Sequence, residues 1–217
     1  MSGIHLALLG MNFGEPAPTV IGQAYGGGFW TGDIGVAGVA THHLVIAPKS
    51  TGQNDGTLYK NAQTAVPGAD SNIDGPQNTA DMIADGNSTV YPAAHFCNNL
   101  SIGGYTDWYM PAKNELEINY FNLKPGTQPN STGSGINPNA IPARATPYTT
   151  SPSVPSQTSA TIFQTGNAEA FTISYYFSST DLAATTCANQ YLGPGLQNNY
   201  NQKNNTQRVR AVRRVPV

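Results

Sequence analysis

The chain has 217 residues, of which 39% are hydrophobic and only 10% are charged, and its formal net charge is −2. Soluble domains usually carry about 25% charged residues, so the polar balance here rests on uncharged amides and hydroxyls. Such a neutral, amide-rich surface argues against binding to the backbone of a nucleic acid, which needs Lys and Arg clustered over a broad face. It favours contact with sugars or with other protein surfaces.

A chain of this length suits one domain, or one domain with an extension. We expect residues 1–70 to form a small β-rich attachment segment, either separate from or integrated into a main domain of residues 71–217. The apolar run at residues 4–9 is too short to cross a membrane and has no basic residues before it. We therefore expect neither a signal peptide nor membrane insertion, and interpret the run as a first strand or an attachment segment.

Cys97 and Cys187 are the only cysteines. Their spacing fits neither a zinc site nor a redox pair. We expect two unpaired thiols, although a disulfide is the alternative if the protein matures outside a reducing cytosol.

The first segment has the composition of strands and turns. Prolines and the Gly26–Gly28 cluster predict extended structure with a tight turn or a bulge over residues 12–28. Residues 42–47 predict a short strand that ends at Pro48. Residues 50–72 are rich in Gly, Asn, Ser and Thr, which predicts a long surface loop.

Two helices are predicted in the middle of the chain. Asp74 and a following proline mark the start of a helix that runs to Asp85. Apolar residues at positions 93, 96, 97 and 100 predict a second helix that begins at Pro92, because this spacing places them on one helical face. A glycine pair at 103–104 ends it.

A third helix follows Trp108. We expect Pro111 to be its first residue and Glu115 to meet the positive end of the helix dipole. Three apolar residues form its predicted buried stripe: Leu116, Tyr120 and Leu123.

The remaining chain alternates between irregular and extended segments. Residues 125–160 are rich in Pro, Asn, Ser and Thr, which predicts a long structureless stretch over the surface. Residues 171–180 are aromatic and β-branched and predict a strand. Residues 208–215 alternate and then slip phase, which predicts a closing strand with a bulge.

Three motifs in this order resemble one protein family. Residues 103–111 (GGYTDWYMP) resemble its GG-aromatic-x-DW-x-x-P motif, and an Asn-Glu-Leu at 114–116 continues it. Residues 176–180 (YFSST) resemble its YWSST strand, with Phe177 in place of Trp, and residues 208–214 match its closing RVRAVRR. The family comprises C-type-lectin-like domains of bacteriophage tail fibres, including variable proteins of diversity-generating retroelements similar to the phage major tropism determinant. The resemblance covers about residues 75–217.

This resemblance implies an α+β fold of the C-type-lectin-like, formylglycine-generating-enzyme-like class, preceded by the small β-rich N-terminal segment. It implies a tail-fibre or tail-tip protein, made in the host cytoplasm and located in the virion, with other virion tail proteins as neighbours. Such a protein is expected to be a homotrimer that binds a glycan or protein receptor on the host surface. In this family the residues between the SST strand and the closing strand face the ligand, which here are residues 181–207.

That segment is rich in Asn and Tyr. Tyr offers a large, stiff contact area and Asn offers adaptable donors and acceptors, as in antibody paratopes. The alternative interpretation is an ordinary solvated turn. The expected ligand-contacting residues are Thr186, Asn189, Tyr191, Gln197, Asn198, Asn199, Tyr200, Asn201, Lys203 and Asn204.

A second group of residues is expected to be structural. Trp108 is interpreted as core rather than as a platform for sugars, and Phe177 as a packing residue. The closing arginines are expected to pair with carboxylates and carbonyls, with anion binding as the alternative. The full structural set is Trp108, Pro111, Glu115, Phe177, Arg208, Arg210 and Arg213.

No catalytic residue, metal ligand or cofactor is expected. His42 and His43 have no third ligand at a recognisable spacing. Glu115 and Glu117 point apart on one helix, so they cannot act as a catalytic pair. Two alternatives to receptor binding stay open: a structural fibre or decoration protein whose Asn-rich surface packs against other subunits, and a calcium-dependent lectin whose ligands would come largely from Asn and backbone oxygens.

Overall fold

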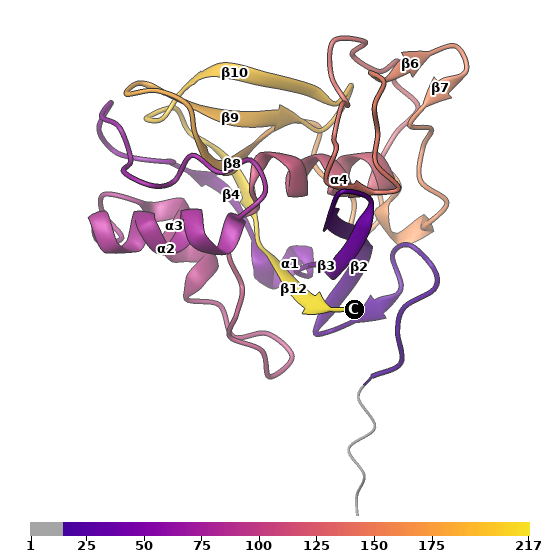
Figure 1. Cartoon of the computed structure of the whole chain (residues 1–217), viewed down its shortest axis with the longest axis horizontal. Coiled ribbons are helices and arrows are strands. Elements are labelled where there is room, and N and C mark those ends of the chain that lie inside the picture. The colour runs from indigo at the N-terminus through magenta and orange to yellow at the C-terminus, as the bar shows by residue number, and fades with distance from the viewer. Residues whose placement is uncertain (1–14) are drawn as a thin grey trace, which may run out of the picture.

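The computed structural model describes residues 15–217, with the backbone alone for residues 198–201. The predicted strand or attachment segment at residues 4–9 lies outside the described residues. Figure 1 shows two sheets that lie on either side of a central helix, α4 (Lys113–Leu123).

One sheet has the strand order β1–β2–β3–β12, with β5 also paired to β2. Its strands are β1 (Ala24–Tyr25), β2 (Gly28–Val36), β3 (Val39–Ile46), β5 (Ala140–Ile141) and β12 (Val212–Pro216), all in antiparallel pairs. Gly26 and Gly27 have positive φ between β1 and β2, which confirms the predicted tight turn. Because β3 pairs with β12, the described part of the first 70 residues shares a sheet with the closing segment.

The other sheet has the order β10–β9–β8–β11–β4. Its strands are β4 (Gln53–Thr57), β8 (Tyr175–Asp181), β9 (Thr186–Tyr191), β10 (Leu196–Gln202) and β11 (Gln207–Arg210). Only the β8–β11 pair is parallel. A single residue, Ala211, separates β11 from β12. The irregularity predicted in the closing strand is therefore a change from one sheet to the other.

The helices are short. They are α1 (Lys49–Gly52), α2 (Gly75–Asp85), α3 (Pro92–Asn98) and α4, with one 3-10 turn, η1 (Thr161–Phe163). The predicted start of α2 is confirmed, because the Asp74 carboxylate accepts a hydrogen bond from the Gln77 N–H at 3.2 Å. The predicted start of α3 at Pro92 is confirmed as well.

The prediction that Pro111 is the first residue of α4 is wrong. The helix begins at Lys113, because the Pro111 carbonyl accepts a hydrogen bond from the Ser179 N–H of β8 at 2.7 Å. Glu115 does lie in the first turn, where its carboxylate accepts from the Ala112 N–H at 2.8 Å. The predicted stripe of Leu116, Tyr120 and Leu123 is buried.

The expected α+β, C-type-lectin-like fold is wrong. The described chain is mostly β-sheet, in two sheets of five strands, and its longest helices have eleven residues. The motifs that suggested the lectin-like fold are local sequences. The layers are set instead by pairing between distant segments, such as β3 with β12 and β4 with β11.

Three predicted boundaries also need correction. Residues 50–72 are not one long loop, since they contain most of α1 and all of β4. Residues 125–160 are not structureless, because they include β5 and the small hairpin of β6 (Thr149–Thr150) and β7 (Ser153–Val154). The strand predicted from Phe171 begins at Tyr175, because the chain bends at Ile173 and Ser174. The Phe171 ring packs edge-on against the Tyr176 ring, with the ring centroids 5.4 Å apart.

Strand β8 lies between two hydrophobic cores. Tyr176 belongs to the core that includes Leu116 and Tyr120 of α4, whereas Phe177 belongs to the core around Trp108. Successive strand side chains point to opposite faces, so adjacent residues enter different cores. Trp108 is 1% exposed and therefore lies in the interior.

Cys97 is a free, buried thiol in the core around Trp108, so it is not joined to Cys187. Burial raises the pKa of the Cys97 thiol, because the thiolate would lose its solvation. We expect Ellman's reagent at pH 8 to leave Cys97 unmodified in the folded protein and to modify it after denaturation. A Ser88→Cys variant, with the thiol at an exposed position, should react at once. Rapid labelling of Cys97 in the folded protein would contradict its burial.

Candidate functional site

Strands β9 and β10 form an antiparallel hairpin at one edge of the second sheet. Most of the segment expected to face the ligand, residues 181–207, is therefore paired strand and not loop. Alternate residues of a strand face opposite sides, so only part of the segment can face solvent. The hairpin nevertheless brings several of the expected contact residues together.

The hairpin turn rests on the central helix. Gly195 has φ +75°, and a Cβ at this position would lie 2.1 Å from the Tyr120 ring of α4. Only glycine fits both the left-handed conformation and this close approach. The Tyr120 hydroxyl lies 3.0 Å from the Gly193 carbonyl oxygen. The turn is therefore held against the core.

The loop at residues 130–135 binds the other side of the turn. The Ser131 N–H donates to the Pro194 carbonyl at 2.8 Å. The Gln197 N–H donates to the Ser134 hydroxyl at 2.9 Å, and the Gln197 Oε1 accepts from the Gly135 N–H at 3.1 Å. These bonds fix the first part of β10, including the predicted contact residue Gln197.

A row of two tyrosines and one leucine crosses the hairpin near its turn. Tyr175 of β8 is paired with Tyr191 of β9, which is paired with Leu196 of β10. Directly paired residues project from the same face of a sheet, and the two tyrosine rings lie 4.8 Å apart. Both tyrosines are half-buried and Leu196 is 37% exposed. We call Tyr175, Tyr191 and Leu196 the aromatic platform.

Three amide side chains lie at the opposite end of the hairpin. The Gln63 Nε2 is 3.1 Å from the Gln202 Oε1 and 3.1 Å from the Asn204 Oδ1, and all three residues are exposed. Thr186, which is half-buried, is paired with Gln202. We call Gln63, Gln202 and Asn204 the amide cluster. Gln63 is not apparent as a site residue from the sequence, because only the fold brings residues 63 and 204 together.

Two expected contact residues are buried, which corrects their assignment as surface residues. Asn189 is 3% exposed, and its Nδ2 donates to the Gln207 Oε1 at 2.8 Å. Lys203 is fully buried, forms an ion pair with Asp181, and donates to the Thr64 carbonyl at 2.9 Å. Lys203 therefore anchors the base of the hairpin instead of facing a ligand.

Four expected contact residues lie in the central part of β10: Asn198, Asn199, Tyr200 and Asn201. The backbone of this part is paired with β9, with an irregular register between Asn198 and Asn201. Their side chains lie outside the described part of the structure. Their role in binding stays a prediction.

A buried polar network centred on α4 contacts the hairpin through Gln190 of β9. Glu117 of α4 is fully buried, pairs with Arg144, and accepts hydrogen bonds from the Tyr148 hydroxyl at 2.7 Å and the Asn137 amide at 2.6 Å. Tyr148 in turn lies 3.4 Å from the amide nitrogen of Gln190 in β9. The sequence alone suggests no structural role for Glu117. Its position between the apolar residues 116 and 118 was the available signal of burial.

The closing arginines are engaged within the protein. Each pairs with a carboxylate: Arg208 with Asp55, Arg210 with Glu169, Arg213 with Asp107 and Arg214 with Glu115. Arg210 and Arg213 also donate to the carbonyls of Ala47 and Gly26, at 2.8 and 3.0 Å. Burial lowers the pKa of Arg210 to about 10. These guanidinium groups hold the closing strands through the carboxylates and carbonyls with which they were expected to pair.

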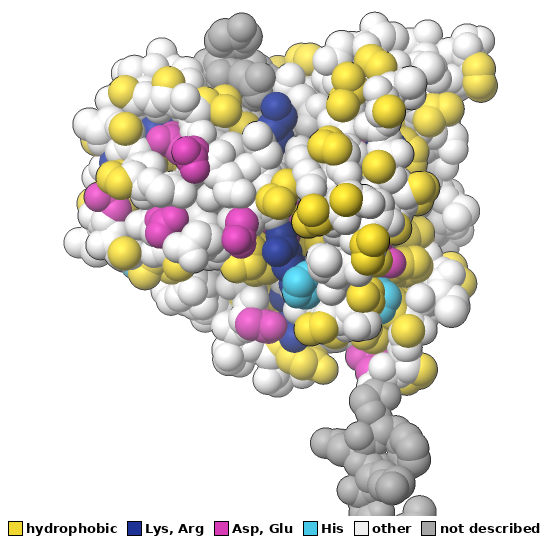
Figure 2. All heavy atoms as spheres, in the orientation of Figure 1, with side chains coloured by type: hydrophobic (Ala, Val, Ile, Leu, Met, Phe, Trp, Pro, Cys, Tyr) yellow, Lys and Arg dark blue, Asp and Glu magenta, His cyan; other side chains and the backbone are white. Residues whose placement is uncertain are grey.

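Residues 15–217 contain neither a cluster of metal ligands nor a membrane-spanning helix. His43 lies 2.7 Å from Asp33, and no group of three or more His, Cys, Asp or Glu side chains in this range could hold a metal ion. No helix of the described chain has the length and apolar character needed to span a bilayer. Figure 2 shows few charged side chains on the face it presents, with several acidic ones over α2 and α3.

Comparison with known proteins assigns no family. No family model matches the sequence, and no curated protein matches it. Among solved structures, the chain is similar to a fimbrial protein from Bacteroides ovatus, with 15% sequence identity and a TM-score of 0.45. The alignment covers 78% of this chain and 35% of the fimbrial protein, so the chain spans about a third of that protein's length.

Proposed function

We propose that the protein is a receptor-binding module of a phage tail fibre or tail tip, which contacts a glycan or protein on the host surface through the β9–β10 hairpin. The observation that supports this most directly is the aromatic platform. Tyr175 and Tyr191 stiffen each other, and Leu196 extends the row to the edge of the sheet.

The arrangement suits recognition because it is fixed before a ligand arrives. The turn rests on Tyr120, and the loop at residues 130–135 binds its other side. Binding then loses little conformational entropy, since the contacting side chains are already restrained. The amide cluster adds neutral donors and acceptors at the far end of the hairpin, which resembles the Tyr and Asn usage of antibody paratopes.

The test is binding of the fluorescently labelled protein to a panel of bacterial strains. On a strain that binds, Tyr191→Ala should reduce binding about tenfold or more, because truncation of a central aromatic contact residue costs about 1.4 kcal/mol or more. Tyr191→Phe keeps the ring stack and should retain most of the binding. Circular dichroism melting of each variant separates lost contact from lost fold.

Val39→Ala provides a matched control, because Val39 is 67% exposed on a different hairpin, between β2 and β3. It should bind as the unchanged protein does. Equal binding by Tyr191→Ala, or binding to no strain in a broad panel, would refute the proposal.

A structural fibre or decoration protein is the second candidate. It is supported by the position of β10 at the edge of its sheet, where an unpaired strand edge can pair with another chain. This candidate requires assembly into an oligomer, such as the expected trimer, with the hairpin buried between subunits. Sedimentation analysis of the protein and of Tyr191→Ala distinguishes the two functions, since only the structural role requires the variant to lose assembly.

A further inference from the structure

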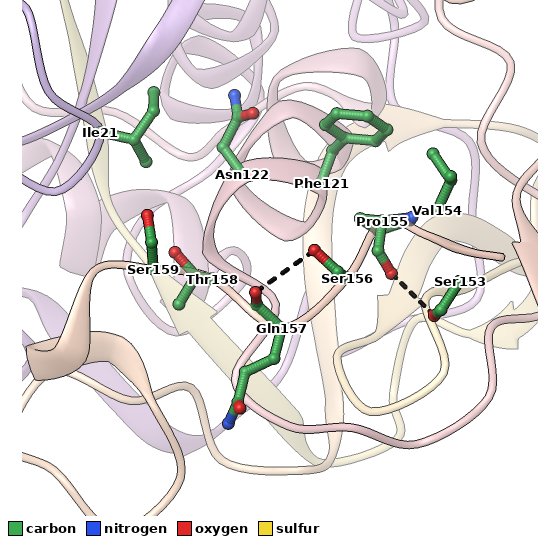
Figure 3. A pocket seen from close by; sticks show the side chains of 10 residues that line it. All are labelled: Ile21, Phe121, Asn122, Ser153, Val154, Pro155, Ser156, Gln157, Thr158 and Ser159. Carbon is green, nitrogen blue, oxygen red and sulfur yellow. Dashed lines mark hydrogen bonds between the residues drawn. The ribbon is translucent and has the colours of Figure 1, made fainter.

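A cleft lies beside the C-terminal end of α4 and is lined by none of the residues of the aromatic platform. Its volume is about 350 Å³, and it is lined by Ile21, Phe121, Asn122 and residues 153–159. Figure 3 shows Phe121 and Pro155 on one side of the cleft, with Ile21 and Ser159 on the other. The volume falls within the usual range of small-molecule sites, about 300–1,000 Å³.

The lining combines apolar surface with neutral hydrogen-bonding groups. Ile21, Phe121, Val154 and Pro155 supply the apolar part, and residues 156–159 (SQTS) supply three hydroxyls and one amide. None of the ten lining residues carries a charge. A phosphate or carboxylate ligand would have no lining cation to neutralise it, and an ammonium ligand would have no lining carboxylate.

The amide of Asn122 has a fixed orientation. Its Nδ2 donates to the Thr31 carbonyl at 2.6 Å, so its Oδ1 is the atom left to accept from a ligand hydroxyl. Phe121 is also restrained, because Arg144 packs 4.0 Å from its ring centroid. Arg144 covers part of the Phe121 ring, and the apolar ring surface that it leaves uncovered lines the cleft.

The 153–159 wall is held in place by bonds to the end of α4 and the residues after it. The Lys124 Nζ donates to the Pro155 carbonyl at 3.3 Å, and the Thr158 N–H donates to the Lys124 carbonyl at 3.0 Å. The Gln157 Nε2 donates to the Pro125 carbonyl at 2.9 Å. A cleft whose wall is already fixed can bind a weakly interacting ligand without the cost of ordering a loop.

We propose that this cleft binds a neutral saccharide of one or two pyranose units. A pyranose has apolar C–H patches that pack on Phe121 and Pro155, and a rim of hydroxyls that both donate and accept. The uncharged hydroxyl and amide groups of residues 156–159 and Asn122 match that rim. This inference is independent of the proposed receptor contact at the hairpin.

The experiment is a ¹⁵N–¹H correlation titration of the whole chain with four neutral probes. These are methyl α-D-glucopyranoside, methyl α-D-mannopyranoside, methyl β-D-galactopyranoside and N-acetyl-D-glucosamine. At least one should give saturable shifts in residues 153–159 and in the side-chain amides of Asn122 and Gln157. Glucose 6-phosphate and N-acetylneuraminic acid, as charged counterparts, should bind more weakly.

Two variants test the location. Ser156→Trp places a large ring in the cleft from an exposed position and should weaken binding by about tenfold or more. Phe121→Leu keeps the cleft open but removes the ring, and should weaken binding as well. Thr146→Trp is the matched control, because Thr146 is also exposed and does not line the cleft.

Three results would overturn the inference: no shift with any neutral probe, a stronger response to the charged probes, or unchanged binding by both variants. If Ser156→Trp fails to fold, Phe121→Leu decides the question. Tyr191→Ala should bind the sugar normally, so failure of the saccharide site and failure of the receptor proposal are distinguishable.

Discussion

Replacing Glu117 with alanine should lower the free energy of unfolding by about 3–5 kcal/mol, because it leaves a partly buried guanidinium without its partner. Arg144 loses its carboxylate, and the Tyr148 hydroxyl and the Asn137 amide lose their acceptor. For a chain of this size the melting temperature should fall by roughly 10 °C. Chemical denaturation followed by circular dichroism measures the change.

Asp55→Ala is the matched control, since it also removes the carboxylate of an ion pair. Its side chain is 67% exposed, so the loss should stay below about 1 kcal/mol. Hydrogen exchange adds a local readout for Glu117→Ala. Because Tyr148 connects Glu117 to Gln190, amides of the β9–β10 hairpin should exchange faster. Equal stability losses in the two variants would contradict a buried network under the hairpin.

Lys124→Met should destabilise the protein by about 1–3 kcal/mol at pH 7, because three oxygen atoms lose a charged donor. The Gln128 carbonyl has no other donor among the described residues, whereas Asn130 Oδ1 keeps the Tyr120 hydroxyl and the Pro155 carbonyl keeps the Asn130 amide. The ammonium of Lys124 is fully buried and donates to the Gln128 carbonyl, the Asn130 Oδ1 and the Pro155 carbonyl, at 2.6, 2.6 and 3.3 Å. All three acceptors are uncharged. Lys113→Met, at the half-buried first residue of the same helix, should change stability by no more than about 0.5 kcal/mol.

The lowered pKa of Lys124 fixes how the stability difference between wild type and Lys124→Met changes with pH. Burial lowers the pKa of Lys124 in the folded protein, so the unfolded chain binds more protons between that value and the unfolded pKa of about 10.4. The stability that depends on Lys124 therefore rises with pH across this window. The difference in unfolding free energy between wild type and Lys124→Met should be larger at pH 10 than at pH 7. A smaller difference at pH 10 would show that the ammonium form is favoured by the fold.

Local features of the chain were predictable where the cause is local. Asp74 and Pro92 mark the starts of α2 and α3 because capping and a fixed φ act within one turn. The start of α4 was not predictable, because the Pro111 carbonyl is bonded to Ser179, which is distant in sequence. The prediction of the fold class was wrong for the same reason, because the two sheets depend on pairing between strands that are distant in sequence. Motifs of a few residues carry no information about which strands pair.

In the candidate site, too, features with local causes were predictable from the sequence and features that depend on tertiary contacts were not. Tyr191 could be identified from composition, whereas its support by Tyr175 depends on the register of β8 and β9. Lys203 looked like a surface cation, and only the tertiary fold supplies Asp181 as its buried partner. Polar residue type alone predicts exposure, and it fails where a distant group of opposite charge compensates burial.

The change of sheet at Ala211 has a consequence for biosynthesis. Strand β11 lies between β8 and β4 in one sheet, and β12 is the last strand of the other sheet, next to β3. Neither sheet is therefore complete until residues 207–216 have been made. The nascent chain must carry β3 and β4 without these partners while more than 140 residues are added. Unpaired strand edges of this kind expose a nascent polypeptide to misassembly. The demand for chaperone protection should therefore be greatest just before these ten residues emerge.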